Sequence, residues 1–166
     1  IIEYDCAHLV LLDIVKNNLQ FSKVPYAELR EIGAELGFHV KTLGYTFSTW
    51  TEFLEWYFMV LEEDYEFNGN KIEGFVLEDS DGLMVKLKLA YYNFWKFMRG
   101  IAVETLRKGH IPNAKCSALT TPTANYFYDW CRRLHSKHRE DGTLDSLPTD
   151  ICSLRKMFYA DMESKE

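Results

Sequence analysis

The stretch KIEGFVLEDSDGLMVKLK, from Lys71 to Lys88, decides how the middle of this chain is interpreted. It reads as two apolar strands around a turn, because the Asp81-Gly82 pair is typical of a tight hairpin. One carboxylate and two ammonium groups nevertheless stand among the apolar residues, namely Glu73, Lys86 and Lys88. The hairpin is therefore either a solvated surface or a site that uses these charges.

The length of the turn decides where the charges point. With a four-residue loop from Asp79 to Gly82, we expect Glu73 opposite Lys88 and Phe75 opposite Lys86. Side chains alternate along a strand, so this register predicts the acid and both lysines on one face. The same face would carry an apolar wall of Phe75, Leu77 and Met84. A slip of one residue would send Glu73 to the other side.

Two interpretations of these charges follow from spacing alone. A solvated cross-strand ion pair between Glu73 and Lys88 would contribute only about 0.2–1 kcal/mol. The apolar neighbours instead indicate partial desolvation, which suits a site for a metal ion and phosphate. A carboxylate can hold Mg²⁺, and lysines can neutralise charge that develops on a phosphoryl group. Gly74 has no side chain, which would let a ligand approach the backbone closely at this position.

The sequence predicts an α+β fold in two parts, residues 1–89 with an antiparallel sheet and residues 90–166 entirely helical. The first part should hold a strand buried on both faces at residues 8–15, and a helix from Pro25 to Gly37. A short strand at residues 39–43 and an aromatic helix at residues 51–64 should precede the hairpin. Thr49 and Glu52 resemble a capping box for that aromatic helix. After residue 89 we expect helices over residues 89–109, 121–139 and 147–166, and no strand.

Composition narrows the class of protein. The 166 residues are 47% hydrophobic, which indicates a folded globular chain, and the net charge of −6 argues against coating nucleic acid by charge alone. Four cysteines without regular spacing (Cys6, Cys116, Cys131 and Cys152) favour reduced thiols in a cytoplasmic protein. No apolar run approaches the roughly 20 residues that span a bilayer, so no membrane partner is expected.

Two short motifs in the hairpin resemble those of a known superfamily. Glu73-Gly74-Phe75-Val76 resembles the EG(F/Y)V motif IV of the covalent nucleotidyltransferases, and Val85-Lys86-Leu87-Lys88 resembles their motif V. Tyr92 follows four residues after the second lysine, as in the phage-type RNA ligase 1 family. Tyr4 and Leu11-Leu12 match the upstream strands of that family. The resemblance covers roughly the first 95 residues.

The resemblance implies an ATP-dependent RNA ligase with a nucleotidyltransferase (ATP-grasp-like ligase) domain and a helical C-terminal domain. In that family a lysine attacks ATP to form lysyl-AMP, AMP moves to an RNA 5′-phosphate, and a 3′-hydroxyl end displaces it. Glu73 would bind the divalent metal, Mg²⁺ or Mn²⁺. Lys86 and Lys88, with Gly74 beside them, would contact the ATP phosphates. The implied partners are ATP and RNA ends.

The family's nucleophilic lysine lies in a KxDG motif before motif IV, and these 166 residues contain no such motif. Lys16, Lys23 and Lys41 lack the required context. Glu3 is not expected to be the motif III glutamate, whose position falls before residue 1. The chain begins at Ile1, so we expect a missing N-terminal part of the same polypeptide to supply the nucleophile. This chain alone should be inactive.

The helix expected at residues 121–139 carries a second candidate surface. Its basic and aromatic side chains could hold an RNA backbone and stack bases. These side chains are Arg132, Arg133, Lys137, His138 and Arg139, beside Tyr126, Tyr128 and Trp130. An amphipathic helix with buried aromatics and solvated charges is the favoured alternative. Cys131, His135 and His138 share a helix face and could bind zinc, although ordinary surface histidines are the default.

Three function classes stay open. The first is the RNA ligase described above. Another covalent nucleotidyltransferase, a DNA ligase or a capping enzyme, shares motifs IV and V but usually continues into an OB-fold of short strands. A non-catalytic RNA- or protein-binding module would carry the hairpin charges only as a surface ion pair. Binding of nucleotide and Mg²⁺ would separate these classes.

Overall fold

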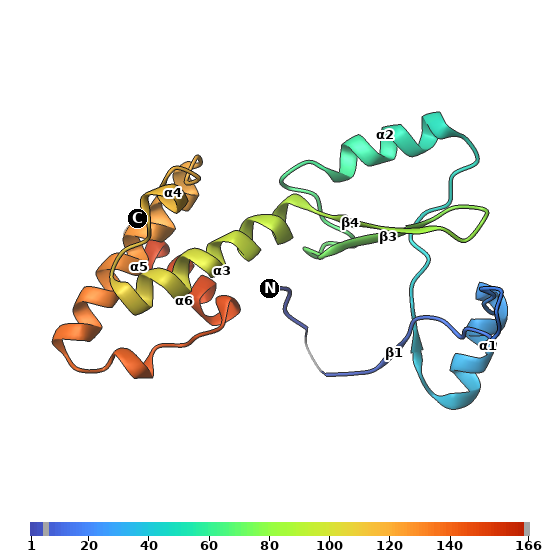
Figure 1. The fold of residues 1–166 in the computed structure, drawn as a ribbon, viewed down its shortest axis with the longest axis horizontal. Coiled ribbons are helices and arrows are strands. Elements are labelled where there is room, and N and C mark those ends of the chain that lie inside the picture. Colours follow the sequence, from blue (N-terminus) through green and yellow to red (C-terminus); the bar gives the residue numbers. More distant parts are fainter. Residues whose placement is uncertain (5–6, 165–166) are drawn as a thin grey trace. The chain divides into compact units, whose positions relative to one another are not determined.

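The computed structural model describes residues 1–4 and 7–164, which form two compact units. One unit comprises Tyr4–Glu55, and the other combines Ile1–Glu3 with Trp56–Glu166. Helices and two small two-stranded sheets make up the chain, as expected for an α+β fold (Figure 1). The nucleotidyltransferase fold and the domain boundary at residues 89 and 90 stay predictions.

The unit Tyr4–Glu55 is built around helix α1 (Tyr26–Leu36). The predicted helix boundaries are confirmed, because Pro25 precedes the first turn and Gly37 ends the helix with a φ of 71°. Strands β1 (Val10–Leu11) and β2 (His39–Val40) pair in parallel beside it. The short strand expected at residues 39–43 is therefore present.

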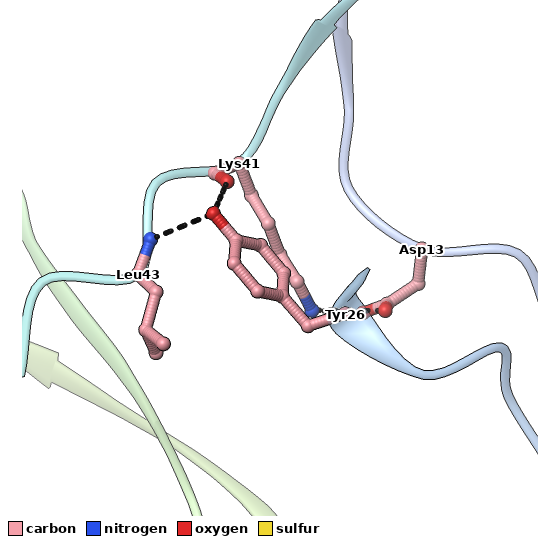
Figure 2. A network of polar contacts seen from close by, with 4 residues as sticks. All are labelled: Asp13, Tyr26, Lys41 and Leu43. Carbon is pink, nitrogen blue, oxygen red and sulfur yellow. Dashed lines mark hydrogen bonds and ion pairs between the residues drawn. The ribbon is translucent and has the colours of Figure 1, made fainter. Parts of the chain in front are cut away.

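A polar network ties this unit together (Figure 2). The Lys41 ammonium donates to both carboxylate oxygens of Asp13 at 2.8 Å. The Tyr26 hydroxyl donates to the Lys41 carbonyl at 3.0 Å and accepts from the Leu43 N–H at 3.3 Å. Lys41, one of the lysines without a KxDG context, is thus committed to an ion pair that joins the segments around β1 and β2.

The prediction of a long strand at residues 8–15 buried on both faces is wrong. β1 contains only two residues, and the side chains of Leu9 and Leu12 are 76% and 64% exposed. A parallel strand is buried when neighbours and helices cover both of its faces. Within the described residues β1 pairs with the two-residue β2 only, so Val10 is exposed and Leu11 only partly buried.

Helix α2 (Trp50–Val60) begins with the predicted capping box. The Glu52 N–H donates to the Thr49 hydroxyl at 3.2 Å, and the Thr49 N–H donates to the Glu52 carboxylate at 3.3 Å. This reciprocal pair satisfies backbone donors that a helix start leaves free. The helix ends four residues earlier than predicted, and of its aromatic side chains only Trp56 is buried.

The second unit contains the hairpin, β3 (Gly74–Glu78) with β4 (Met84–Lys88), and four helices. These are α3 (Ala90–Lys108), α4 (Asn113–Cys116), α5 (Pro122–Glu140) and α6 (Ile151–Glu163), with a 3₁₀ turn at Leu144–Ser146. No strand follows β4 in the described part of the chain, as predicted. None of the described helices has the length and apolar character that crossing a membrane requires.

The core of this unit lies between α3, α5 and α6 (Figure 1). Trp95, Phe127 and Phe158 are each at most 1% exposed, and their rings meet edge to face at 5.2–5.5 Å. The side chain of Thr121 caps the start of α5, and that of Asp150 caps the start of α6. Gly109 ends α3 with a φ of 74°, as predicted.

Candidate functional site

The turn of the hairpin is one residue longer than predicted. Strand β3 ends at Glu78 and β4 begins at Met84, so the loop has five residues. The Asp79 carboxylate accepts hydrogen bonds from the N–H groups of Asp81 and Leu83, both at 2.9 Å. An aspartate side chain that bonds the backbone ahead of it can hold a loop of this kind. The Asp-Gly signal identified the turn but not its length.

The predicted register is consequently wrong by one residue. Val76, not Phe75, lies opposite Lys86, and Phe75 lies opposite Leu87. Cross-strand partners share a face, so the two lysines lie on the face of Val76 and Met84, away from Phe75 and Leu77. Lys86, Val76 and Met84 are exposed, which removes most of the expected apolar wall.

Phe75 serves the opposite face of the hairpin. Its ring packs edge to face against Trp56, Tyr65 and Phe67, with centroids 5.1–6.2 Å apart. Trp56 is 6% exposed, so α2 and the segment after it cover this side of β3. Phe75 therefore anchors the hairpin in the fold, while the two lysines lie on the opposite face.

Glu73 and Lys88 form an ion pair despite the changed register. Glu73 lies just before β3, where strand alternation no longer applies, because Gly74 bends the backbone with a φ of 153°. The Leu89 N–H donates to the Glu73 carbonyl at 3.1 Å and holds this bend against the end of β4. The predicted meeting of the acid with one lysine is therefore confirmed, by a different geometry.

The structure explains why residue 74 is a glycine. A Cβ atom at this position would lie 1.9 Å from the carbonyl oxygen of Leu87. No side chain fits there, because β3 and β4 approach each other too closely. The missing side chain is thus required by the hairpin itself, and a role of Gly74 in binding a ligand stays a prediction.

The ion pair is open to solvent on one side. The side chains of Lys88 and Glu73 are 37% and 42% exposed, so both can reach an external ligand. The Lys88 ammonium lies 4.8 Å from the centroid of the Tyr92 ring, and the Lys96 ammonium lies 5.9 Å from the same ring. An aromatic face between two cations attracts both of them. The start of α3 thus adds a further lysine, Lys96, next to the hairpin.

Arg155 is a charged residue that the sequence analysis missed. It is 7% exposed, donates to the Ile1 carbonyl at 2.9 Å and to the Glu3 carboxylate at 2.8 Å. Its guanidinium also lies over the rings of Tyr91 and Trp95, at 5.4 and 5.3 Å. The signal was present, since Ile151, Leu154, Arg155 and Phe158 recur at the spacing of one helix face.

The surroundings of Arg155 perturb two ionisable groups. Hydrogen bonding from Lys156, with a further bond from Arg155, lowers the pKa of the Glu3 carboxyl, although burial opposes this. Burial raises the pKa of the Tyr91 hydroxyl. Glu3 is thus engaged in ion pairs with two residues of α6, Arg155 and Lys156.

Only some residues of the basic and aromatic cluster on α5 are exposed. Trp130 is 5% exposed and belongs to the core, whereas Tyr126 is 59% exposed. Arg132 and Arg133 line a polar hollow at the end of α3. The other residues of that hollow are Gly109, Asp129 and Ser136. Lys137 and Arg139 are exposed on the same helix, and their contact with RNA stays a prediction.

The structure does not support the zinc alternative. Burial raises the pKa of the Cys131 thiol to about 12, and its neighbour His135 bonds the Leu106 carbonyl through Nδ1 at 2.8 Å. The Nδ1 atom of His138 bonds the Thr143 hydroxyl at 2.8 Å instead. Over residues 1–4 and 7–164 no three metal-ligating side chains gather.

The cysteines give no disulfide framework in the described chain. Cys116, Cys131 and Cys152 carry free thiols, as the sequence predicted. Cys6 lies outside the described residues.

The site thus consists of the Glu73–Lys88 ion pair and of Tyr92, whose ring lies near Lys88 and Lys96. It lies in the part of the chain that resembles motifs IV and V. A family model described as RNA ligase matches residues 1–92, more than half of the sequence. The chain belongs to the phage-type RNA ligase family. The match ends at Tyr92, in the first turn of α3. Comparisons with curated proteins and with solved structures find no match.

Proposed function

We propose that this chain forms part of an ATP-dependent RNA ligase and supplies its motif IV carboxylate and motif V lysines. The supporting observation is the half-exposed ion pair of Glu73 and Lys88, which lies within the range of the family match. In this ligase an RNA 5′-phosphate would be activated with AMP and joined to a 3′-hydroxyl. Joining is phosphoryl-type chemistry, in which positioning and charge neutralisation lower the barrier.

Glu73 is the residue that would hold a divalent metal. Its side chain is 42% exposed, and carboxylate oxygens are ligands of Mg²⁺ and Mn²⁺, so the residue fits either metal ion. A bound metal supplies charge stabilisation at phosphate oxygens. In the structure Lys88 occupies the carboxylate instead. A metal ion at Glu73 and a phosphate at Lys88 would each replace one partner of this ion pair.

Lys88 and Lys86 would bind the phosphates of ATP. Both side chains lie on one face of β4, two residues apart, and Lys86 is fully accessible. An ammonium group neutralises a phosphate as a compact point charge without a fixed orientation. Tyr92 and Asn93 support this end of β4, since the Asn93 amide donates to the Lys88 carbonyl at 3.3 Å.

Removing the carboxylate tests the proposal. We expect Glu73→Ala to abolish RNA sealing in the polypeptide that carries both this chain and a KxDG lysine, because the metal loses its ligand. Glu73→Gln, which keeps the shape but not the charge, should fail as well. Glu78→Gln changes another glutamate of the same hairpin and should retain activity. Gel analysis of a 5′-labelled RNA substrate measures sealing. Normal sealing by Glu73→Ala would remove the metal-binding role.

The lack of a KxDG lysine gives a second prediction. Incubated with α-³²P-ATP and Mg²⁺, the 166-residue chain should remain unlabelled on a denaturing gel, because no residue in it occupies the nucleophile's motif. A covalent nucleotidyltransferase of known activity serves as the positive control. Acid-labile label on this chain would contradict the prediction and place the nucleophile among its own lysines.

The rivals make different predictions. A DNA ligase or capping enzyme shares the hairpin chemistry, but the described chain continues after β4 into helices and not into the short strands of an OB-fold. A DNA ligase would seal nicked DNA in the assay above, whereas we expect joining of RNA ends only. A binding module without catalysis would tolerate both Glu73 variants.

A further inference from the structure

A hollow of about 350 Å³ lies on the helical surface of the second unit. Its lining residues come from α3 and α4: Asn93, Lys96, Phe97, Gly100, Ile101 and Lys115. The five residues from α3 recur at spacings of three and four, so they share one side of the helix. All six follow Tyr92, where the family match ends.

The floor of this hollow is apolar and open. Phe97 is 38% exposed, while Ile101 beneath is 1% exposed. A Cβ atom added to Gly100, which also lines the hollow, would meet no atom within 4 Å, so a side chain at this position would project into open space. The volume lies at the lower end of about 300–1,000 Å³ that small-molecule sites occupy. A flat ring of ligand size can therefore lie on this floor.

The rim of the hollow is cationic. Lys96 and Lys115 line it, and no acidic side chain does. Glu104, farther along α3, pairs with Lys108 at 2.6 Å. That bond is the main cause that lowers the pKa of Glu104, and the charge of Lys115 adds to it. Two ammonium groups beside an apolar floor complement a ligand with a flat base and phosphates.

Tyr92 connects the hollow to the hairpin site. The Lys96 ammonium, on the rim, lies 5.9 Å from the Tyr92 ring centroid, and the Lys88 ammonium lies 4.8 Å from it. Helix α3 continues directly from β4 (Figure 1), so both sites belong to one continuous stretch of backbone. Lys88 and Lys96 thus lie near the same aromatic ring, and Lys96 and Lys115 line the same hollow.

We propose that this hollow binds one nucleotide of a single-stranded RNA end that is being presented to the hairpin site. The base stacks on Phe97 in the space above Gly100, and Lys96 and Lys115 bind the phosphates on either side. The assignment rests on the proposed function for the choice of RNA as the ligand, but it uses none of the residues to which that function assigns chemistry.

Filling the hollow tests the assignment without changing any charge. Gly100→Leu places a side chain in the space where the base would stack, and leucine is the better helix former, so α3 should stay folded. We expect the affinity of the 166-residue chain for a short fluorescein-labelled single-stranded RNA, measured by anisotropy, to fall at least 5-fold. Phe97→Ala should weaken it by roughly 5- to 150-fold, the range for loss of one stacked base.

The lysines are tested through salt dependence. For single strands the slope of log affinity against log salt becomes shallower by about 0.7 for each phosphate that the protein no longer neutralises. The double change Lys96→Ala with Lys115→Ala should therefore reduce the slope by about 1.4. Lys16→Ala with Arg99→Ala removes the same charge from exposed positions outside the hollow and should leave the slope nearly unchanged.

Four results would overturn the assignment. The first two are no measurable RNA binding by the unmodified chain and an RNA affinity of Gly100→Leu equal to that of the unmodified chain. The other two are equal effects of the two double variants on the salt slope, and displacement of the labelled RNA by poly-glutamate as effectively as by unlabelled RNA. The last result would indicate an acidic protein segment as the ligand.

The test of the RNA-binding hollow can fail independently of the test of the proposed function. If Gly100→Leu loses RNA binding while Glu73→Ala still seals, the hollow stands and the metal role falls. If Gly100→Leu binds RNA normally while Glu73→Ala cannot seal, the hollow falls and the proposed function stands.

Discussion

Gly74→Ala is expected to break the end of the β3–β4 hairpin and to separate Glu73 from Lys88. The added methyl group would lie 1.9 Å from the Leu87 carbonyl oxygen, and alanine is strained at a φ of 153°. Backbone strain of about 1–3 kcal/mol and overpacking of about 1–3 kcal/mol give a local loss of about 2–6 kcal/mol. Loss of sealing should accompany it, because the carboxylate and the ammonium are no longer held together.

Amide hydrogen exchange measures this effect where it occurs. A loss of 2 kcal/mol or more should accelerate exchange of the β3 and β4 amides by about 30-fold or more, with little change in α5. Gly82→Ala is the matched control, since its φ is also positive, at 84°, but a Cβ atom there meets nothing within 4 Å. It should cost only the strain of about 1–2 kcal/mol. Equal effects of the two variants would show that the collision with Leu87 is unimportant.

Phe127→Ala is expected to destabilise the helical core by about 3–5 kcal/mol, the usual cost of deleting a fully buried aromatic side chain. Phe127 is 0% exposed, and its ring meets Trp95, Trp130 and Phe158 with centroids 5.2–5.7 Å apart. The cavity would therefore lie where α3, α5 and α6 join. Whole domains are stable by only about 5–15 kcal/mol, so this variant should lose much of its helical signal at moderate urea concentrations.

Urea denaturation followed by circular dichroism at 222 nm measures the loss. Tyr126→Ala removes an aromatic ring from the neighbouring position of α5 and provides the control. Tyr126 is 59% exposed, so its variant should stay within about 0.5 kcal/mol of the unmodified protein. Comparable destabilisation by the two changes would mean that the helices do not share the core described above.

Local sequence signals predicted the individual elements well. Pro25 and Gly37 delimit α1, Thr49 and Glu52 cap α2, and Gly109 ends α3, because each signal acts through hydrogen bonds and φ values of adjacent residues. The failures concern contacts between distant segments. The apolar run at residues 8–15 was expected to be buried, but burial depends on what covers a strand and not on the strand itself.

In the candidate site, too, local features could be predicted from the sequence, whereas the contacts between segments could not. The charges of the hairpin could be identified from motif spacing, whereas the side to which they point depended on one residue of loop length. Asp79 lengthened the loop through two hydrogen bonds, and Gly74 then returned Glu73 to Lys88 through a bend that strand alternation does not include. Helical spacing places Arg155 on the buried face of α6, but its partners, Ile1 and Glu3, are far away in the sequence and only the structure brings them to it.

The sequence by itself determined the limits of α1, the capping box of α2, the end of α3, the hairpin, the resemblance to two ligase motifs and the lack of a KxDG lysine, since these depend on residues close together in the chain. Only the tertiary structure decided the strand register, the bend through which Glu73 reaches Lys88, the partners of Arg155 and the hollow beside Phe97. These features arise where segments far apart in sequence pack against each other. A shift of the strand register by one residue, or the space left by one glycine, changes which side chains meet. Neither can be predicted from the preference of single residues for helix or strand.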